Sequence, residues 1–107
     1  MTITLRPIYW AGDSDDVVRG WSRKTKKQAG AELFRLQLGR DPLHWRSMKS
    51  VGRGVREIKI AEGGQFRVLY LTRRMDEIVV LHAFEKKTRR TTKADIELGK
   101  QRLKGLK

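Results

Sequence analysis

Three successive runs of β-forming residues between Val55 and Thr88 constrain the fold of this chain more than any other feature. The runs read VREIKI, QFRVLYLTR and EIVVLHAFEKKT, and they are separated by Gly63-Gly64 and by Arg74-Met75-Asp76. Short turn-forming junctions of this kind join antiparallel neighbours. The stretch therefore predicts a three-stranded antiparallel meander on which the remaining segments pack.

The segments on either side of the meander carry one short β pattern and three helical patterns. Residues 3–10 form a β-segment that Pro7 should place at a sheet edge or bend. Capping residues then predict a short helix to about Trp21, a longer helix from Ser22 to Gly39 and a C-terminal helix after Thr92. Residues 41–54 have no sustained period and predict a loop. The last helix has few apolar residues and contains Gly99, which predicts weak anchoring.

We therefore expect a single α+β domain over residues 1–107, with the element order β-α-α-β-β-β-α. The two N-terminal helices should pack on one face of the antiparallel sheet and leave the other face free. Strand alternation places Ile58 and Phe66 toward these helices, and Lys59 and Arg67 on the free face. The Arg67 guanidinium is suited to a phosphate; a salt bridge with Glu57 is the alternative, and the two can coexist.

The charge of the chain indicates a polyanionic partner. The formal net charge is +13, and the two halves contribute almost equally, so the folded domain itself must be basic. This predicts nucleic acid as the first choice of partner and an anionic membrane as the second. The absence of cysteine excludes a disulfide framework, a thiolate zinc site and a thiol nucleophile. The N-terminus lacks a signal-peptide pattern, so we expect a cytoplasmic protein without a membrane partner.

Basic residues are dense where the third run ends. A charge run is either a solvated surface or a binding site for a nucleic-acid backbone, and we favour backbone binding here. The RNA-binding candidates are Lys86, Arg89, Arg90, Arg56 and Phe84. For Phe84 the alternative to stacking on a base is core packing. His82 is a catalytic candidate, although a lone histidine in a strand is more often a packed, hydrogen-bonded residue.

The segments GVREIKI, FRVLYL and VLHAFEKKTRRTTKADIELGKQRL, preceded by a two-helix segment that ends in LFRLQLG, resemble the phage-derived, HigB-like branch of the RelE/HigB toxin superfamily. The resemblance covers nearly the whole chain. It implies a compact RelE-like fold and the toxin of a type II toxin–antitoxin system. Such a toxin is a metal-independent endoribonuclease (mRNA interferase) that uses no cofactor and cleaves mRNA, in many members at the ribosome. A small antitoxin, commonly of the helix-turn-helix type, neutralises it, so operator DNA is contacted only through the antitoxin.

The same resemblance assigns roles to individual residues. Four residues match positions at which RelE-like toxins hold RNA phosphates and stabilise the transition state: Lys59, Arg67, Lys86 and Lys87. The catalytic candidates are therefore Arg67, Lys59, Lys87 and His82. The ribose 2′-OH attacks the adjacent phosphate, which requires a base, cations around the phosphate and an acid for the leaving 5′ oxygen.

The acid and the base are left open at this point. A late tyrosine of some relatives is missing after EKKTRRTTK, so His82, Lys59 or Tyr70 would have to replace it, and Tyr70 is predicted to face the core. The alternative function is a non-catalytic RNA- or ribosome-binding domain. A phage structural or assembly protein is the third possibility, and the strand-borne Arg67 and the basic run argue against it.

Overall fold

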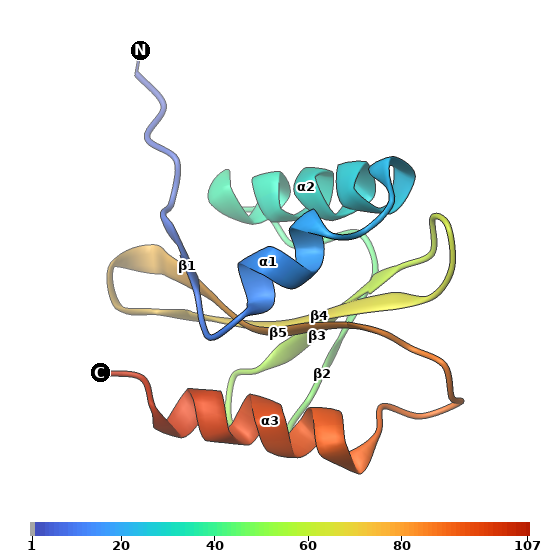
Figure 1. Ribbon diagram of the computed structural model, residues 1–107. Helices are drawn as coiled ribbons and strands as arrows, with labels where there is room; N and C mark the ends of the chain where they lie inside the picture. Colours follow the sequence, from blue (N-terminus) through green and yellow to red (C-terminus); the bar gives the residue numbers. More distant parts are fainter. Residues whose placement is uncertain (1) are drawn as a thin grey trace.

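The computed structural model describes residues 2–107, which form a five-stranded sheet between two helical layers (Figure 1). The elements follow in the order β1 (Ile8–Trp10), α1 (Ser14–Arg19), α2 (Arg23–Gln37), β2 (Trp45–Ser47), β3 (Arg56–Ile60), β4 (Phe66–Arg73), the 3₁₀ turn η1 (Arg74–Asp76), β5 (Glu77–Glu85) and α3 (Lys93–Lys104). This confirms the predicted α+β class and its element order, with β2 as an addition. Among the described residues no helix is both long and apolar enough to cross a membrane.

The strands lie in the order β1-β5-β4-β3-β2. Strands β3, β4 and β5 form the predicted antiparallel meander. Strand β1 lies at one edge, as Pro7 led us to expect, and pairs in parallel with β5. The predicted segment 3–10 is a strand only over its last three residues, after Pro7. Strand β2 forms the other edge and pairs antiparallel with β3. The prediction of a loop over residues 41–54 was therefore wrong for Trp45–Ser47, because a three-residue edge strand is too short to show a period and is defined by its pairing with β3.

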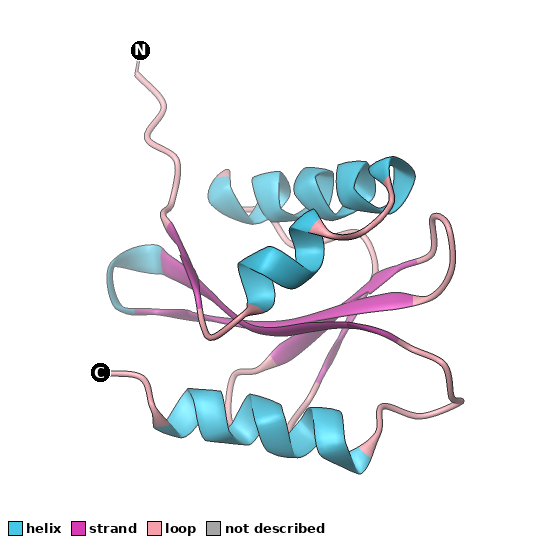
Figure 2. Cartoon of the chain, viewed as in Figure 1, coloured by secondary structure: helices cyan, strands magenta, loops and turns pink. Residues whose placement is uncertain are grey.

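Helices α1 and α2 cover one face of the sheet (Figure 2). The Ser22 hydroxyl caps α2 by accepting a hydrogen bond from the Thr25 amide at 3.3 Å, as the sequence predicts. The apolar stripe of α2 then packs on inward-facing residues of the meander. The buried members of this first core are Val18, Ala29, Leu33, Leu36, Ile58, Ile60, Phe66, Val68, Tyr70, Ile78, Val80 and Ala83. The face assignment from strand alternation is thus confirmed.

The opposite face is not free, because α3 packs against it (Figure 1). The second core combines strand residues with the β2–β3 connection: Met48, Val51, Val55, Leu69, Val79, Leu81 and Phe84. Gly99 allows the close approach, since a Cβ there would lie 3.0 Å from Val51 Cγ1 and 3.2 Å from Leu69 Cδ1. Arg102 adds hydrogen bonds to the Leu81 carbonyl at 3.0 Å and to Asp13 at 2.6 Å. The expectation of an uncovered face was therefore wrong, whereas weak anchoring of α3 stays a prediction.

An irregularity in β5 changes which side chains reach this face. Leu69 lies opposite His82 while Tyr70 lies opposite Val80, so Leu81 is an extra residue in β5. Such a β-bulge interrupts strict alternation. Leu81 joins the second core and the adjacent His82 contacts α3, so consecutive side chains serve the same face.

Candidate functional site

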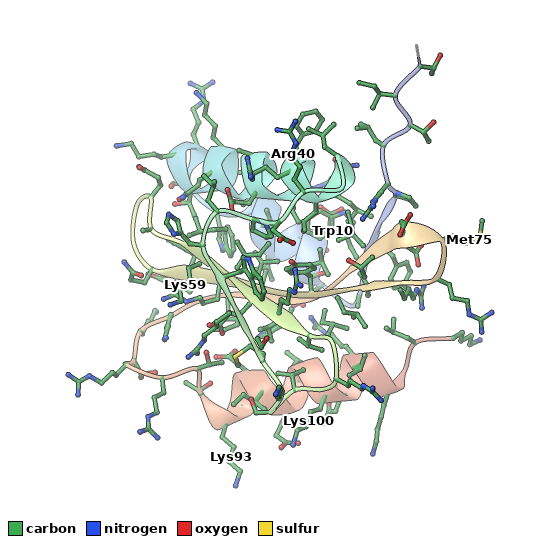
Figure 3. The ribbon with its side chains drawn as sticks, turned by 180° about the vertical axis from the view of Figure 1, so that it is seen from behind. Trp10, Arg40, Lys59, Met75, Lys93 and Lys100 are labelled. Atoms are coloured by element: carbon green, nitrogen blue, oxygen red, sulfur yellow. The ribbon has the colours of Figure 1, made fainter. Side chains whose placement is uncertain are left out.

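Four cationic side chains gather near the β3–β4 hairpin, and we call them the basic cluster: Arg46, Lys59, Arg67 and Lys86. Lys59 and Arg67 lie opposite each other on β3 and β4, and Figure 3 shows Lys59 at this end of the sheet. The Lys86 amide donates to the Gln65 carbonyl at 2.6 Å, which joins the end of β5 to the hairpin. The charges of the three other members act on the Lys86 ammonium. The cluster is thus assembled from four separate segments.

A buried carboxylate lies within this cluster. Glu57 is fully buried, and its Oε1 accepts a hydrogen bond from Arg46 Nε at 2.9 Å. The Thr91 hydroxyl donates to Glu57 Oε2 at 2.6 Å and accepts from Arg46 Nη2 at 3.2 Å. Arg67 Nε lies 3.6 Å from Glu57 Oε1. The predicted Glu57–Arg67 pair is therefore confirmed.

Arg46 and Thr91 are members of this network that sequence reasoning missed. Arg46 belongs to the segment read as a loop, and its position opposite Glu57 follows only from the β2–β3 pairing. A basic residue in a short polar segment upstream of a strand-borne glutamate is the one signal that could have indicated it. Thr91 comes close to Glu57 only through the fold of the connection before α3.

Arg67 is a largely buried cation held in place by protein contacts. Its Nη1 donates to the Phe66 carbonyl at 2.8 Å, whereas its buried Nε has no hydrogen-bond partner. Burial lowers the pKa of the Arg67 guanidinium, and the negative charge of Glu57 opposes this shift. An arginine nevertheless stays protonated at neutral pH. The Arg67 side chain is therefore a permanent, largely buried cation whose orientation is set by its contacts with the Phe66 carbonyl, Gln65 and Glu57.

The two lysines of the basic cluster lie in different surroundings. Lys59 is exposed, whereas Lys86 is partly buried. Burial lowers the pKa of the Lys86 ammonium, and the positive charge of Arg67 lowers it further. A pair of titratable groups in unlike environments can take different proton-transfer roles.

His82 and Phe84 belong to the second core side of β5. His82 Nε2 lies 2.8 Å from Asp95 Oδ1 on α3, a contact in which the imidazole N–H donates to the carboxylate. The His82 ring stacks on Phe84 with centroids 4.9 Å apart, and both side chains are buried. The structure therefore ties His82 to α3 rather than to the basic cluster, and places the Phe84 ring in packing contact. Catalysis by His82 and base stacking by Phe84 stay predictions.

The remaining candidates are dispersed. Arg56 lies on the α2 side of β3, away from the basic cluster. Its guanidinium is 3.9 Å from the Trp45 ring centre and forms an ion pair with Asp41 at 2.9 Å. Tyr70 is buried in the first core, as predicted, and faces away from the cluster. The other predicted residues are exposed in the connection between β5 and α3: Lys87, Arg89 and Arg90. Their roles stay predictions.

The described residues offer no metal site, and the sequence matches one known family. Within residues 2–107 no group of three or more His, Asp or Glu side chains is close enough to hold a metal ion. The sequence profile of the family described as "Phage derived protein Gp49-like (DUF891)" matches residues 16–104, which include the whole basic cluster. A search of curated proteins finds no match to the chain. The chain therefore belongs to the Gp49-like family of phage-derived proteins, a RelE-like, toxin-like family.

Proposed function

We propose that this protein is the toxin of a type II toxin–antitoxin system, of the HigB-like branch, and that it cleaves mRNA at the ribosome. The observation that carries the proposal is the basic cluster with the buried Glu57 beneath it. Arginines on a solvated surface need no buried carboxylate to orient them. A site that holds one phosphate in a defined position needs such a carboxylate, because it fixes the arginines before the substrate binds. Cations that are already in place need no reorganisation during the reaction.

The proposed reaction is attack of a ribose 2′-OH on its own 3′ phosphate. Lys86 in its neutral form accepts the 2′-OH proton, and burial, which lowers the pKa of its ammonium, increases the fraction of this side chain that is neutral. The 2′ oxygen bonds to phosphorus while the bond from phosphorus to the 5′ oxygen breaks. Arg67 stabilises the pentacoordinate phosphate, and Lys59 donates a proton to the leaving oxygen. The products are a 2′,3′-cyclic phosphate and a free 5′-OH.

The partners follow from the same proposal. The substrate is mRNA in the cytoplasm, and a small antitoxin, of the helix-turn-helix type, masks the basic cluster and contacts operator DNA on behalf of the complex. Expression of the chain alone should arrest growth, and co-expression of a neighbouring small gene should restore it. Primer extension on a reporter mRNA after induction should reveal new 5′ ends.

Replacement of Arg67 tests the site. Arg67→Ala should lower the cleavage rate by roughly 100-fold or more, the loss typical of removing a transition-state donor. Arg67→Lys keeps a positive charge beside Glu57 but lacks the fork of two donors, so it should also cleave slowly while remaining folded by circular dichroism. Arg40→Ala, which removes an exposed arginine on the α2 side of the sheet (Figure 3), is the matched control. Undiminished cleavage by both Arg67 variants would remove Arg67 from the site.

A non-catalytic RNA- or ribosome-binding domain is the second candidate. It is favoured by the engagement of His82 with Asp95, which leaves the proposed chemistry to lysines. Such a domain would bind RNA in a salt-sensitive manner, yet primer extension would show no new 5′ ends.

A further inference from the structure

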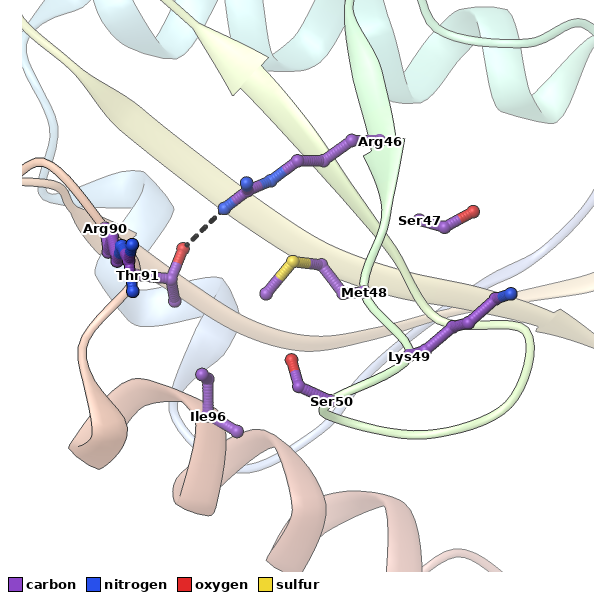
Figure 4. A pocket seen from close by; sticks show the side chains of 8 residues that line it. All are labelled: Arg46, Ser47, Met48, Lys49, Ser50, Arg90, Thr91 and Ile96. Carbon is purple, nitrogen blue, oxygen red and sulfur yellow. Dashed lines mark hydrogen bonds between the residues drawn. The ribbon is translucent and has the colours of Figure 1, made fainter.

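A cleft of about 350 Å³ opens directly beside the basic cluster, between β2 and the start of α3 (Figure 4). It is lined by Arg46, Ser47, Met48, Lys49, Ser50, Arg90, Thr91 and Ile96. Arg46 and Thr91, which are hydrogen-bonded to each other at 3.2 Å, also hold Glu57. The cleft therefore begins where the basic cluster ends, and its volume lies at the lower end of the range of about 300–1,000 Å³ for small-molecule sites.

The side chains that enter the cleft have complementary chemistry. Figure 4 shows Arg46, Met48, Ser50 and Ile96 directed toward a common space, with Arg90 and Thr91 along one side, whereas Ser47 and Lys49 point away from it. Met48 and Ile96 supply apolar surface, the arginines supply planar cations, and the Ser50 hydroxyl supplies a hydrogen-bonding group, whereas the Thr91 hydroxyl is already bonded to Glu57 and Arg46. No carboxylate lines this cleft.

Two other surface clefts lack this combination. The cleft near Tyr70 includes Asp41 in its lining, and the cleft along α3 includes Glu97. Each of these carboxylates is paired with a cation of the same lining and offsets part of the positive charge that a phosphodiester would meet, so neither cleft is equally suited to a polyanion. The cleft beside the basic cluster is also continuous with the proposed reaction site, through Arg46.

We propose that this cleft binds one unpaired nucleotide of the RNA, the one adjacent to the scissile phosphate. The base packs with one face on Met48 and Ile96 and is contacted by guanidinium planes, while the Ser50 hydroxyl lies at its polar edge. Arg46 and Arg90 contact the phosphate that this nucleotide carries. A base in such a cleft has left the helical stack, so the substrate is single-stranded at this position. The inference rests on the proposed function, since both require RNA at the basic cluster.

The test combines a change in the RNA with a change in the protein. Short 2′-O-methyl oligoribonucleotides cannot undergo the 2′-OH reaction, and an abasic residue can be placed at each position in turn. For the unmodified protein, fluorescence anisotropy should show one position at which loss of the base weakens binding by roughly 10-fold, as expected for a stacked base. Ser50→Trp fills the cleft and removes no hydrogen bond of the Ser50 side chain in the described structure, and it should reduce that penalty to less than about twofold.

A second variant covers the case in which Ser50→Trp does not fold. Arg90→Ala should weaken binding of the unmodified oligonucleotide more than Arg40→Ala, which removes an equal charge from the other side of the molecule. An abasic penalty of equal size at every position, or one that Ser50→Trp leaves unchanged, would overturn the inference. Because the oligonucleotides are not cleaved, this result is independent of whether the protein cleaves mRNA.

Discussion

The substitution Glu57→Gln offers the sharpest test of how the basic cluster is held. Gln is nearly isosteric with Glu, so it removes the negative charge without creating a cavity. Arg46 can turn toward water, because 44% of its side chain is exposed. Arg67 cannot, because only 8% of its side chain is exposed, and it would be left as a buried cation without its counter-charge.

The size of the effect follows from this imbalance. Removing one partner of a buried ion pair costs about 3–5 kcal/mol, and the retained amide oxygen of Gln places the expected loss near 3 kcal/mol. That is a large part of the roughly 5–15 kcal/mol that stabilises a typical domain, and it corresponds to a Tm lower by roughly 12 °C or more. Urea titration and thermal unfolding followed by circular dichroism would measure both quantities.

Two further variants separate the charge effect from a packing effect. Glu97→Gln is the matched control: Glu97 has 51% of its side chain exposed and lies 3.5 Å from Lys100, so its loss should change the free energy of unfolding by less than about 0.5 kcal/mol. The double variant Glu57→Met/Arg67→Met should be more stable than Glu57→Gln, because it leaves no unpaired charge on Arg67. If Glu57→Gln unfolds with the same free energy as the unmodified protein, the carboxylate does not hold Arg67.

Two other predictions concern α3 and the proposed base. Gly99→Ala should destabilise the protein by about 1 kcal/mol, because the new Cβ would lie 3.0 Å from Val51 Cγ1. Gly30→Ala in α2 should stabilise it by about 0.5–1 kcal/mol, because a Cβ there would have nothing within 4 Å. Equal urea midpoints for the two variants would contradict the close packing of α3. The cleavage rate should rise with pH over a range that lies below the ordinary lysine pKa of 10.5, because only neutral Lys86 accepts a proton and its pKa is lowered. Lys86→Arg keeps the charge and should lose this rise along with most of the rate, and a profile that it leaves unchanged would exclude Lys86 as the base.

The parts of the fold that could be predicted are those governed by local chemistry. Gly63-Gly64 fixed the first hairpin of the meander, and both glycines have positive φ. Ser22 and Thr92 each accept a hydrogen bond from the amide three residues on, as their sequence context indicates. Strand alternation correctly placed Lys59 beside Arg67 and Glu57 within reach of it.

The parts that could not be predicted depend on contacts between distant segments. The apolar residues of α3 are few, and they suffice only because Met48, Val51 and Val55 complete the second core from the β2–β3 connection. Arg46 joins the site through pairing of a three-residue strand that carries no periodic pattern. The bulge at Leu81 gives no sequence signal either, yet it decides that His82 faces α3.

The positions of His82 and Arg67 are linked through the start of α3, although the two side chains do not touch in the described contacts. Thr91 holds Glu57, which pairs with Arg67. The next residue, Thr92, caps α3 and donates to Asp95 Oδ2 at 2.7 Å, while Asp95 Oδ1 accepts from His82. Because Thr91 and Thr92 are consecutive, a shift of the first turn of α3 moves both networks together. A loss of activity in a His82 variant therefore does not by itself indicate proton transfer, since displacement of Thr91 would disturb the Glu57 network that orients Arg67.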